Sequence, residues 1–302
     1  MDGFLNLFKP SGPTSADMID AVRAALGVNA GHAGTLDPLA EGVLPVGLGA
    51  ARRLLPYLRH DKEYEGVLRL GQESDTQDLG GTLTEPRPVT TDAATVRAAG
   101  ETLTGDLILP VPMYSAVHVG GRRLHELARA GAAITPPTRT MTIFSLEVLE
   151  VDLPRVRFRV SCAGGTYVRS LAAEWGRRLG CGGLLERLAR TRAGSFLLAD
   201  TIRPDALAAL AQAGRAGEAV VPAARALAHC PEVRLSDADA TRLTQGQWVA
   251  PPPDLVAAAG APLRATRPDG RLVGIASLDA VRGAGAPVLV AVRMLPPGTA
   301  MA

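Results

Sequence analysis

Asp37 is the residue of this sequence whose surroundings best suit catalysis. It lies in the segment GHAGTLDPLAEGVLPVGLG, residues 31–49, among glycines, a histidine and a proline. Glycine allows positive φ angles and close approach of another chain, and Pro38 favours an extended backbone at Asp37, which would fix the direction of the carboxylate. A carboxylate held in this way can act as a nucleophile or a general base. The alternative is a structural turn, because aspartate before proline commonly begins one.

The basic residues offer a second candidate chemistry, which is binding of a polyanion. Only Lys9 and Lys62 are lysines, and they lie in the segments on either side of the Asp37 loop. Between residues 155 and 192 nine arginines stand against two glutamates, a local charge of +7 in a chain whose net charge is +2. This segregation predicts either a basic surface for a polyanion or ordinary solvated faces.

The sequence contains no pattern typical of a metal or cofactor site. Its three cysteines, Cys162, Cys181 and Cys230, are odd in number and widely spaced, with no CxxC pair and no clustered histidines. This spacing argues against a zinc site and against a disulfide framework. No nucleotide-cofactor motif is present either. We therefore expect neither a metal nor a cofactor.

Length and composition indicate a globular protein with a large and a small domain. The chain has 302 residues, of which 47% are hydrophobic and 21% charged, as is usual for folded domains. The N-terminus lacks the basic and apolar regions of a signal peptide, and no apolar run has membrane-spanning length. These features predict a cytoplasmic protein without a membrane anchor.

The elements expected to position the candidate residues are helices and strands of unequal length. Thr14 stands three residues before Asp17, as in a capping box, ahead of an apolar helical face. Apolar residues and arginines alternate in RVRFRVSC, which predicts a strand with one buried and one basic face. The predicted helices cover 14–27 and 168–179, and the predicted strands cover 63–72, 142–151 and 155–162. Without a regular βαβ period, this order favours an α+β fold with a mixed sheet.

Six segments, in order, resemble the motifs of the TruB family of tRNA pseudouridine synthases. They span most of residues 4–198 and read FLNLFKPSGPTSADMI, GHAGTLDPLAEGVLPVGLGAARRL, DKEYEGVLRLGQESDTQDLGG, PVPMYSAVHVGGRRLHELARAG, VSCAGGTYVRSLAAEWGRRLG and LLERLARTRAGSF. One such motif would be suggestive, whereas six in order are highly specific. After an alanine-rich stretch at 203–232, the short β-like runs from about residue 233 resemble the small β module called PUA.

The resemblance implies roles for five residues. Asp37 takes the place of the catalytic aspartate, Tyr64 that of a tyrosine that stacks on the target base, and Arg169 that of an arginine that pairs with the aspartate. His32 matches a histidine that enters the T-loop as the target nucleotide flips out, and Leu188 an apolar contact in the pocket. Such a site fits the chemistry, because a base inside a folded loop must leave its stack to be modified.

The implied architecture has two parts. The first is an α+β pseudouridine synthase catalytic domain over residues 1–228, with a mixed, mainly antiparallel sheet and an insertion around 85–135. The second is a small all-β, PUA-like RNA-binding domain over 229–302. RNA contacts are expected from four basic residues, Lys9, Lys62, Arg264 and Arg267. The family motif often has a lysine where this chain has Gly164, and nearby arginines are the candidates to replace it.

The implied function is isomerisation of uridine to pseudouridine at position 55 in the T-loop of tRNA, by a monomer that needs no protein partner. One alternative is a guide-RNA-dependent pseudouridine synthase, against which the insertion-like segment 111–131 argues. Another is a tRNA-folding RNA-binding protein in which catalysis is secondary. Attack by Asp37 on C6 of the base or on C1′ of the sugar stays open, because either reaction needs the carboxylate in nearly the same place.

Overall fold

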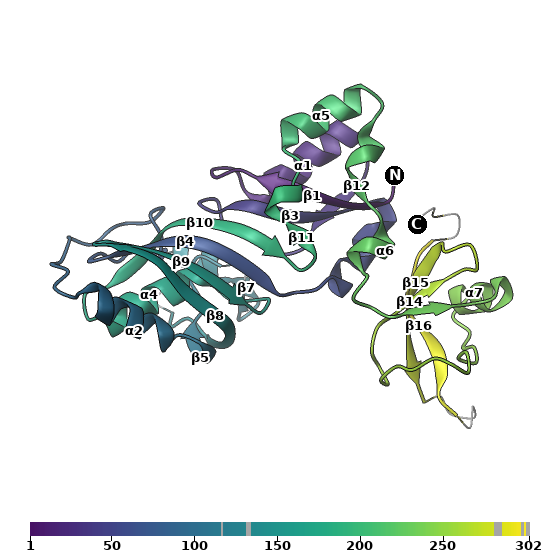
Figure 1. Ribbon diagram of the computed structural model, residues 1–302. Coiled ribbons are helices and arrows are strands. Elements are labelled where there is room, and N and C mark those ends of the chain that lie inside the picture. Colours follow the sequence, from purple (N-terminus) through teal and green to yellow (C-terminus); the bar gives the residue numbers. More distant parts are fainter. Residues whose placement is uncertain (116, 131–133, 281–285, 297–298, 300–302) are drawn as a thin grey trace.

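A computed structural model describes residues 1–115, 117–130, 134–280, 286–296 and 299 (Figure 1). Within these residues ten strands form one large sheet in the order β12 (Val220–Val221), β1 (Gly3–Lys9), β3 (Glu41–Leu48), β10 (Gly183–Ala193), β4 (Lys62–Leu70), β9 (Arg155–Cys162), β8 (Thr138–Asp152) and β5 (Gly105–Pro110), with β2 (Ala30–His32) beside β3 and β11 (Phe196–Leu197) beside β10. The β3–β10 pair is parallel, and the other described pairs of this sheet are antiparallel. The prediction of a mixed, mainly antiparallel sheet is confirmed.

Helices cover the sheet from two sides (Figure 1). The longer ones are α1 (Ser15–Leu26) and α5 (Pro204–Gln212) on one side, and α2 (Ala93–Glu101) and α4 (Val168–Arg178) on the other. The others are the 3-10 helices η1 (Gly49–Tyr57), η2 (Leu198–Asp200) and η3 (Ala216–Ala219), and the short α-helix α6 (Ala223–Ala226). Helix α1 begins at the predicted capping box, in which Thr14 and Asp17 each bind the other's backbone N–H. None of the helices in the described part of the chain combines the length and apolar character needed to cross a membrane.

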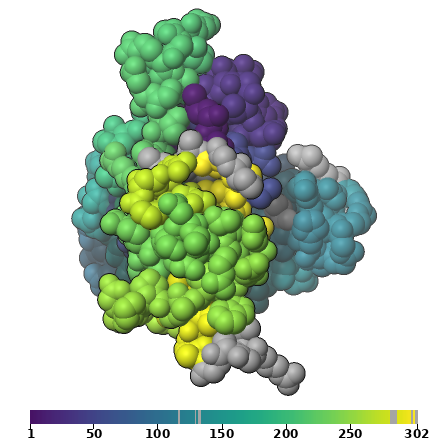
Figure 2. Space-filling model, turned by 90° about the vertical axis from the view of Figure 1, so that its right-hand side faces the viewer, coloured from purple at the N-terminus to yellow at the C-terminus, as the bar shows by residue number. Residues whose placement is uncertain are grey.

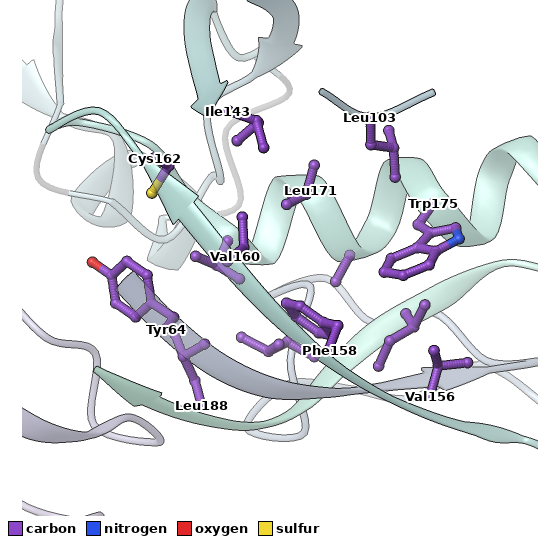
Figure 3. Packing of buried hydrophobic residues seen from close by; sticks show 14 of the residues in the cluster. Tyr64, Leu103, Ile143, Val156, Phe158, Val160, Cys162, Leu171, Trp175 and Leu188 are labelled. Carbon is purple, nitrogen blue, oxygen red and sulfur yellow. The ribbon is translucent and has the colours of Figure 1, made fainter. Parts of the chain in front are cut away.

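One hydrophobic core lies between helices α2 and α4 and strands β4, β9 and β8. The apolar side chains of β9 face this core, as the alternating sequence predicted. Phe158 of β9 meets Trp175 of α4 edge to face, with ring centroids 5.8 Å apart, an arrangement that adds about 1 kcal/mol to simple burial. Tyr64 of β4 and Leu188 of β10 lie at the end of the same core (Figure 3). The core therefore fixes both side chains before any ligand binds.

Strands β1 and β3 are covered on both faces. Leu5 and Leu44 pack against α1 and α5, whereas Phe4 and Val43 pack against η1, α6 and part of the C-terminal segment. Strands buried on both faces are apolar along their whole length rather than alternating. This explains the unbroken apolar run that follows Asp37 in the sequence.

The arginines of β9 do not form a basic surface. Each contacts a carboxylate on a neighbouring strand: Arg155 with Glu186 at 2.8 Å, Arg157 with Glu150 at 3.1 Å, and Arg159 with Glu65 at 2.7 Å. Such exposed pairs contribute little to stability, but they neutralise the strand. For this strand, the contacts favour an ordinary solvated face over a basic surface that binds a polyanion.

Residues 85–135, predicted as an insertion, divide into two parts in the structure. Helix α2 and strand β5 belong to the main core and sheet. Strands β6 (His118–Val119) and β7 (Arg122–Arg123) form a separate hairpin, which α3 (Leu124–Arg129) follows. Residues 116 and 131–133 of the predicted insertion lie outside the described residues.

The C-terminal segment folds into a small module of its own sheet. Its strands are β13 (Glu232–Arg234), β14 (Leu263–Thr266), β15 (Leu272–Asp279) and β16 (Val288–Met294). The module also contains helix α7 (Asp237–Thr244), which the sequence pattern did not predict and which the Ser236 side chain caps. Leu272 and Ile275 belong to the same apolar cluster as Phe4 of β1, and Figure 2 shows the module in front of the core. The module thus packs directly on the larger domain.

Gly42 allows β3 to join β10, and this join holds one end of the Asp37 loop. Gly42 pairs with Arg190, its φ is 105°, and a Cβ there would lie 2.3 Å from the Arg190 carbonyl oxygen. We expect Gly42→Ala to lower the free energy of unfolding by about 3 kcal/mol, because backbone strain and a steric clash add together. Urea denaturation measures this change.

Gly12→Ala is the matched control for this prediction. The φ of Gly12 is 111°, but a Cβ there would have no atom within 4 Å. This variant isolates the backbone strain, so its loss of stability should be about 1–2 kcal/mol. Equal losses in the two variants would contradict the proposed clash between β3 and β10.

Candidate active site

The loop that carries Asp37 connects β2 to β3 and is pinned by the residues before and inside α1. The Ser15 hydroxyl donates to the Leu36 carbonyl at 3.0 Å and accepts from the Leu36 N–H at 2.9 Å. The Gly12 N–H donates to the Pro38 carbonyl at 2.8 Å. Sequence reasoning missed Ser15, although the small polar residues of KPSGPTS were a signal that this segment packs closely on another one. These bonds hold the backbone on both sides of the carboxylate.

Lys9 supports the Asp37 loop from beneath. Its side chain is fully buried, and its ammonium donates to the carbonyls of Ala40 at 2.6 Å, Pro10 at 3.0 Å and Pro38 at 3.4 Å. Burial lowers the pKa of Lys9 to about 8, and the Asp37 carboxylate opposes this shift. The lysine is therefore still protonated at neutral pH. Its position does not support the predicted contact with RNA, because every donor direction points into the protein.

Arg190 holds both ends of the same loop. It is fully buried on β10, its Nε donates to the Val43 carbonyl at 2.6 Å, and its Nη2 donates to the Gly34 carbonyl at 3.0 Å. The sequence analysis did not select Arg190, since an arginine in a strand normally faces solvent. Two buried cations, Lys9 and Arg190, thus stabilise the backbone around Asp37.

Asp37 and Arg169 form an ion pair across 132 residues of sequence. Arg169 Nε lies 2.8 Å from Asp37 Oδ2, and Arg169 Nη2 donates to Asp37 Oδ1 at 3.1 Å. The guanidinium also donates to the carbonyls of Thr76 at 3.0 Å and Tyr114 at 3.1 Å. Only 5% of the Arg169 side chain is exposed, against 37% for Asp37. A rigid, buried arginine therefore orients a carboxylate that remains accessible.

A second carboxylate, Asp78, lies on the other side of Arg169. Its Oδ2 is 3.7 Å from Arg169 Nη1, and its Oδ1 accepts from the Thr76 hydroxyl at 2.6 Å and from the Gly80 N–H at 2.8 Å. The sequence analysis missed Asp78, although it lies in the quoted segment ESDTQDLGG. Asp78 therefore helps to hold the Arg169 side chain in place, and the two carboxylates face one guanidinium.

The pKa of Asp37 is raised above the ordinary carboxyl value. Burial is the largest cause, the Arg169 cation lowers the pKa, and the Asp78 carboxylate raises it. These effects follow from the cost of charge in a poorly solvated site and from the signs of the two neighbours. A carboxylate with a raised pKa is a stronger base and nucleophile once it is ionised.

The Asp37 carboxylate borders a cavity of about 250 Å³. Lys62, Tyr64 and Leu188 line it from the sheet, and Thr166 and Arg169 line it from the start of α4 and the segment before this helix. Figure 3 shows the ring of Tyr64 beside Leu188 at the border of the core. Burial raises the pKa of Tyr64, so this residue is a neutral phenol that presents an apolar ring.

Lys62 is among the residues that line the cavity, whereas His32 is not. His32 ends β2, and its Nδ1 is buried without a partner among the described residues. Burial and the Arg190 cation lower the pKa of His32, which keeps its imidazole neutral at pH 7. Lys62 lines both the Asp37 cavity and a neighbouring one of about 240 Å³, and burial lowers its pKa.

Gly164 is explained by close packing in this region. A Cβ there would lie 3.0 Å from the His60 Cβ and 3.1 Å from the His60 carbonyl oxygen, so a larger side chain would crowd the backbone. At the adjacent Gly165, the nearest atom to such a Cβ is Nη1 of Arg139, at 3.6 Å. Arg139 therefore places a positive charge beside the position where a lysine is common in the family.

The two C-terminal arginines predicted to bind RNA both make contacts within the protein. Arg264 donates to the carbonyls of Cys230 at 2.9 Å and Ala224 at 3.2 Å, which ties β14 to the connection between the domains. Arg267 pairs with Asp237 at 2.6 Å. The position of Arg264 supports a structural role rather than the predicted RNA contact, whereas Arg267 pairs with an exposed carboxylate that a phosphate can displace.

The known proteins that are similar to this chain are described as pseudouridine synthases. A profile described as TruB family pseudouridylate synthase (N terminal domain) matches residues 23–168. A protein of Geobacillus kaustophilus named tRNA pseudouridine synthase B is 42% identical over 82% of this chain and 90% of its own length. A protein of Aromatoleum aromaticum with the same name is 41% identical over 92% of this chain and 89% of its own length.

A solved structure matches nearly the whole chain. One chain in the crystal structure of a Cbf5–Nop10–Gar1 complex superposes with a TM-score of 0.73, at 26% sequence identity, covering 97% of this chain and 85% of that one. The match includes the C-terminal module. The two-part α+β architecture predicted from the sequence is therefore confirmed.

Proposed function

Because the chain belongs to the TruB family of pseudouridylate synthases, we propose that it converts uridine 55 in the T-loop of tRNA to pseudouridine, with Asp37 as the nucleophile. One observation carries this proposal: the accessible carboxylate of Asp37, held by the buried Arg169, borders a cavity walled by an aromatic ring. The curated relatives that are 41–42% identical to the chain are named as tRNA enzymes, which supports tRNA as the substrate.

The reaction is an isomerisation and balances without a co-reactant. The C1′–N1 bond of uridine breaks, a C1′–C5 bond forms, and the hydrogen on C5 leaves as a proton while N1 gains one. The enzyme therefore has to hold the detached base, rotate it and move protons. We assign to Asp37 the attack on either C6 of the base or C1′ of the sugar, since its carboxylate borders the cavity that the target nucleotide would enter.

The shape of the site supports base flipping. The cavity borders a packed core and admits a single base rather than a folded RNA loop, so the target uridine has to leave its stack. The ring of Tyr64 replaces the lost stacking on one face, and Leu188 supplies an apolar contact. His32, on the strand that leads into the loop, is the side chain we assign to the space that the uridine vacates. A neutral imidazole can stack there without the cost of burying a charge.

Positive charge in and beside the cavity supports RNA binding. Lys62 lines the cavity, and Arg139 lies beside Gly165, which also lines it. Phosphate contacts position an RNA without reading its sequence, so we assign these two cations, with Arg267 in the C-terminal module, to the backbone of the T-stem-loop. Selection of the target uridine then depends on the loop shape and on the flipped base.

We further propose that the protein acts as a single chain on bare tRNA, without a guide RNA or a protein partner. The test is release of tritium from an unmodified tRNA transcript that carries uridine tritiated at C5, with no other component added. We expect release to approach one equivalent per tRNA and to vanish when residue 55 of the transcript is cytidine. No release from the uridine transcript would favour a guide-dependent enzyme, and release that persists with cytidine 55 would contradict the assigned position.

A further inference from the structure

Buried polar atoms without partners gather around the Asp37 cavity. Nine such side-chain atoms occur among the described residues, and three of them belong to residues that line this cavity. These three residues are Ser115, Thr166 and Arg169. Native proteins satisfy nearly all buried polar groups, so a polar atom on a cavity wall that has no partner in the protein marks a place where a polar ligand completes the hydrogen bond.

Ser115 is the member of this group that has no alternative role in the protein. Arg169 Nε already faces Asp37 at 2.8 Å, and the Thr166 hydroxyl lies beside the thiol of Cys162. The Ser115 side chain lines the cavity, the residue is 7% exposed, and its hydroxyl has no partner among the described residues. A ligand in the cavity is therefore the available partner for this hydroxyl.

The backbone of Ser115 is fixed relative to the catalytic ion pair. Its carbonyl accepts from the His125 N–H at 3.2 Å, and His125 Nδ1 lies 3.0 Å from the same oxygen. The carbonyl of the preceding residue, Tyr114, accepts from Arg169 at 3.1 Å. The Ser115 hydroxyl thus projects from a segment that binds the same guanidinium as Asp37.

We infer that Ser115 is a specificity-determining residue, whose hydroxyl donates a hydrogen bond to a carbonyl oxygen of the flipped uracil. This inference rests on the proposed function. Uracil presents two carbonyl acceptors, at C2 and C4, and these must be satisfied when the base enters a buried site. The Ser115 hydroxyl on the cavity wall meets this requirement without adding charge beside Asp37.

The test combines changes in the enzyme with changes in the RNA. Synthetic T-stem-loops carry uridine, 2-thiouridine or 4-thiouridine at the target position, and nucleoside chromatography after digestion measures the C-glycoside product. With the uridine RNA, Ser115→Ala should lower kcat/KM about tenfold, the effect of one neutral hydrogen bond. With the analogue that replaces the contacted oxygen by sulfur, wild type and Ser115→Ala should have equal kcat/KM, because the bond is already lost.

Ser170→Ala is the matched control. Ser170 is also a buried serine near the ion pair, but its hydroxyl already donates to the Pro110 carbonyl at 2.7 Å. The ratio of its kcat/KM to that of wild type should be the same on all three RNAs. Thermal unfolding of both variants shows whether the fold is retained.

Two results would overturn the inference. One is an unchanged kcat/KM of Ser115→Ala on the uridine RNA, and the other is a constant tenfold loss on all three RNAs, which would assign Ser115 to a structural role. Failure of wild type to convert the uridine RNA would contradict the proposed function and the inference with it. The wild-type reaction on the uridine RNA therefore distinguishes failure of the proposed function from failure of the inference about Ser115.

Discussion

Replacement of Asp37 with asparagine should abolish pseudouridine formation while the protein stays folded and binds tRNA. The substitution keeps the size of the side chain and a contact with Arg169 but removes the nucleophile. We expect the rate of tritium release to fall by at least about 10⁴-fold, the usual consequence of removing a covalent nucleophile. Single-turnover tritium release and a filter-binding assay with the same transcript measure catalysis and binding separately.

The stability of Asp37→Asn provides the control for this prediction. The raised pKa means that the folded protein binds a proton at pH values where the unfolded chain has lost it, so ionised Asp37 costs stability at neutral pH. Asparagine removes this cost, and Asp78 still faces the Arg169 guanidinium. The melting temperature should therefore change by no more than about 4 °C, or roughly 1 kcal/mol. A large drop would attribute the lost activity to unfolding rather than to the missing nucleophile.

The same variant separates an enzyme from an RNA-folding protein. If catalysis is secondary, Asp37→Asn should refold a misfolded tRNA transcript as well as wild type does, because the binding surface is unchanged. Native-gel analysis of the refolded transcript gives this comparison. Equal refolding would support an additional role in tRNA folding, and it would leave the assignment of the nucleophile to the tritium assay.

The pair of Asp37 and Arg169 was accessible from the sequence because its members lie in local motifs. Asp37 stands in a glycine-rich loop and Arg169 opens a predicted helix, so the resemblance to family motifs placed both without knowledge of the fold. Their separation of 132 residues was no obstacle to this. Helix α1 was equally predictable, since the capping box of Thr14 and Asp17 is a local signal.

The residues that support the pair were harder to predict because their roles depend on tertiary packing. Lys9 was predicted to contact RNA, but β1 is covered on both faces and its last side chain turns inward under the loop. Arg190 lies on a strand in which register shifts fall between Leu185 and Arg187 and between Arg190 and Arg192. These irregularities break the alternation that would otherwise reveal which face of β10 is buried.

Two substitutions at Arg169 should each lower the rate, and together they separate the orientation of Asp37 from the effect of the positive charge. Arg169→Lys keeps a positive charge but loses the planar fork that binds Asp37 through two nitrogens and reaches the carbonyls of Thr76 and Tyr114. We expect kcat to fall about 10²-fold from misalignment. Arg169→Gln also removes the charge, and we expect a fall of about 10³-fold at pH 7.

The pH dependence distinguishes misalignment from loss of charge. The proposed mechanism requires ionised Asp37, so the rate should fall as pH decreases through the pKa of that carboxyl, which in wild type already lies above its ordinary value. Arg169 lowers this pKa and Asp78 raises it, so removal of the cation moves the acid limb of the profile to higher pH. Arg169→Gln should therefore recover part of its loss as the pH rises, whereas Arg169→Lys should lose a constant factor across the profile. Parallel profiles for the two variants would show that Arg169 acts by orienting Asp37 and not by keeping it ionised.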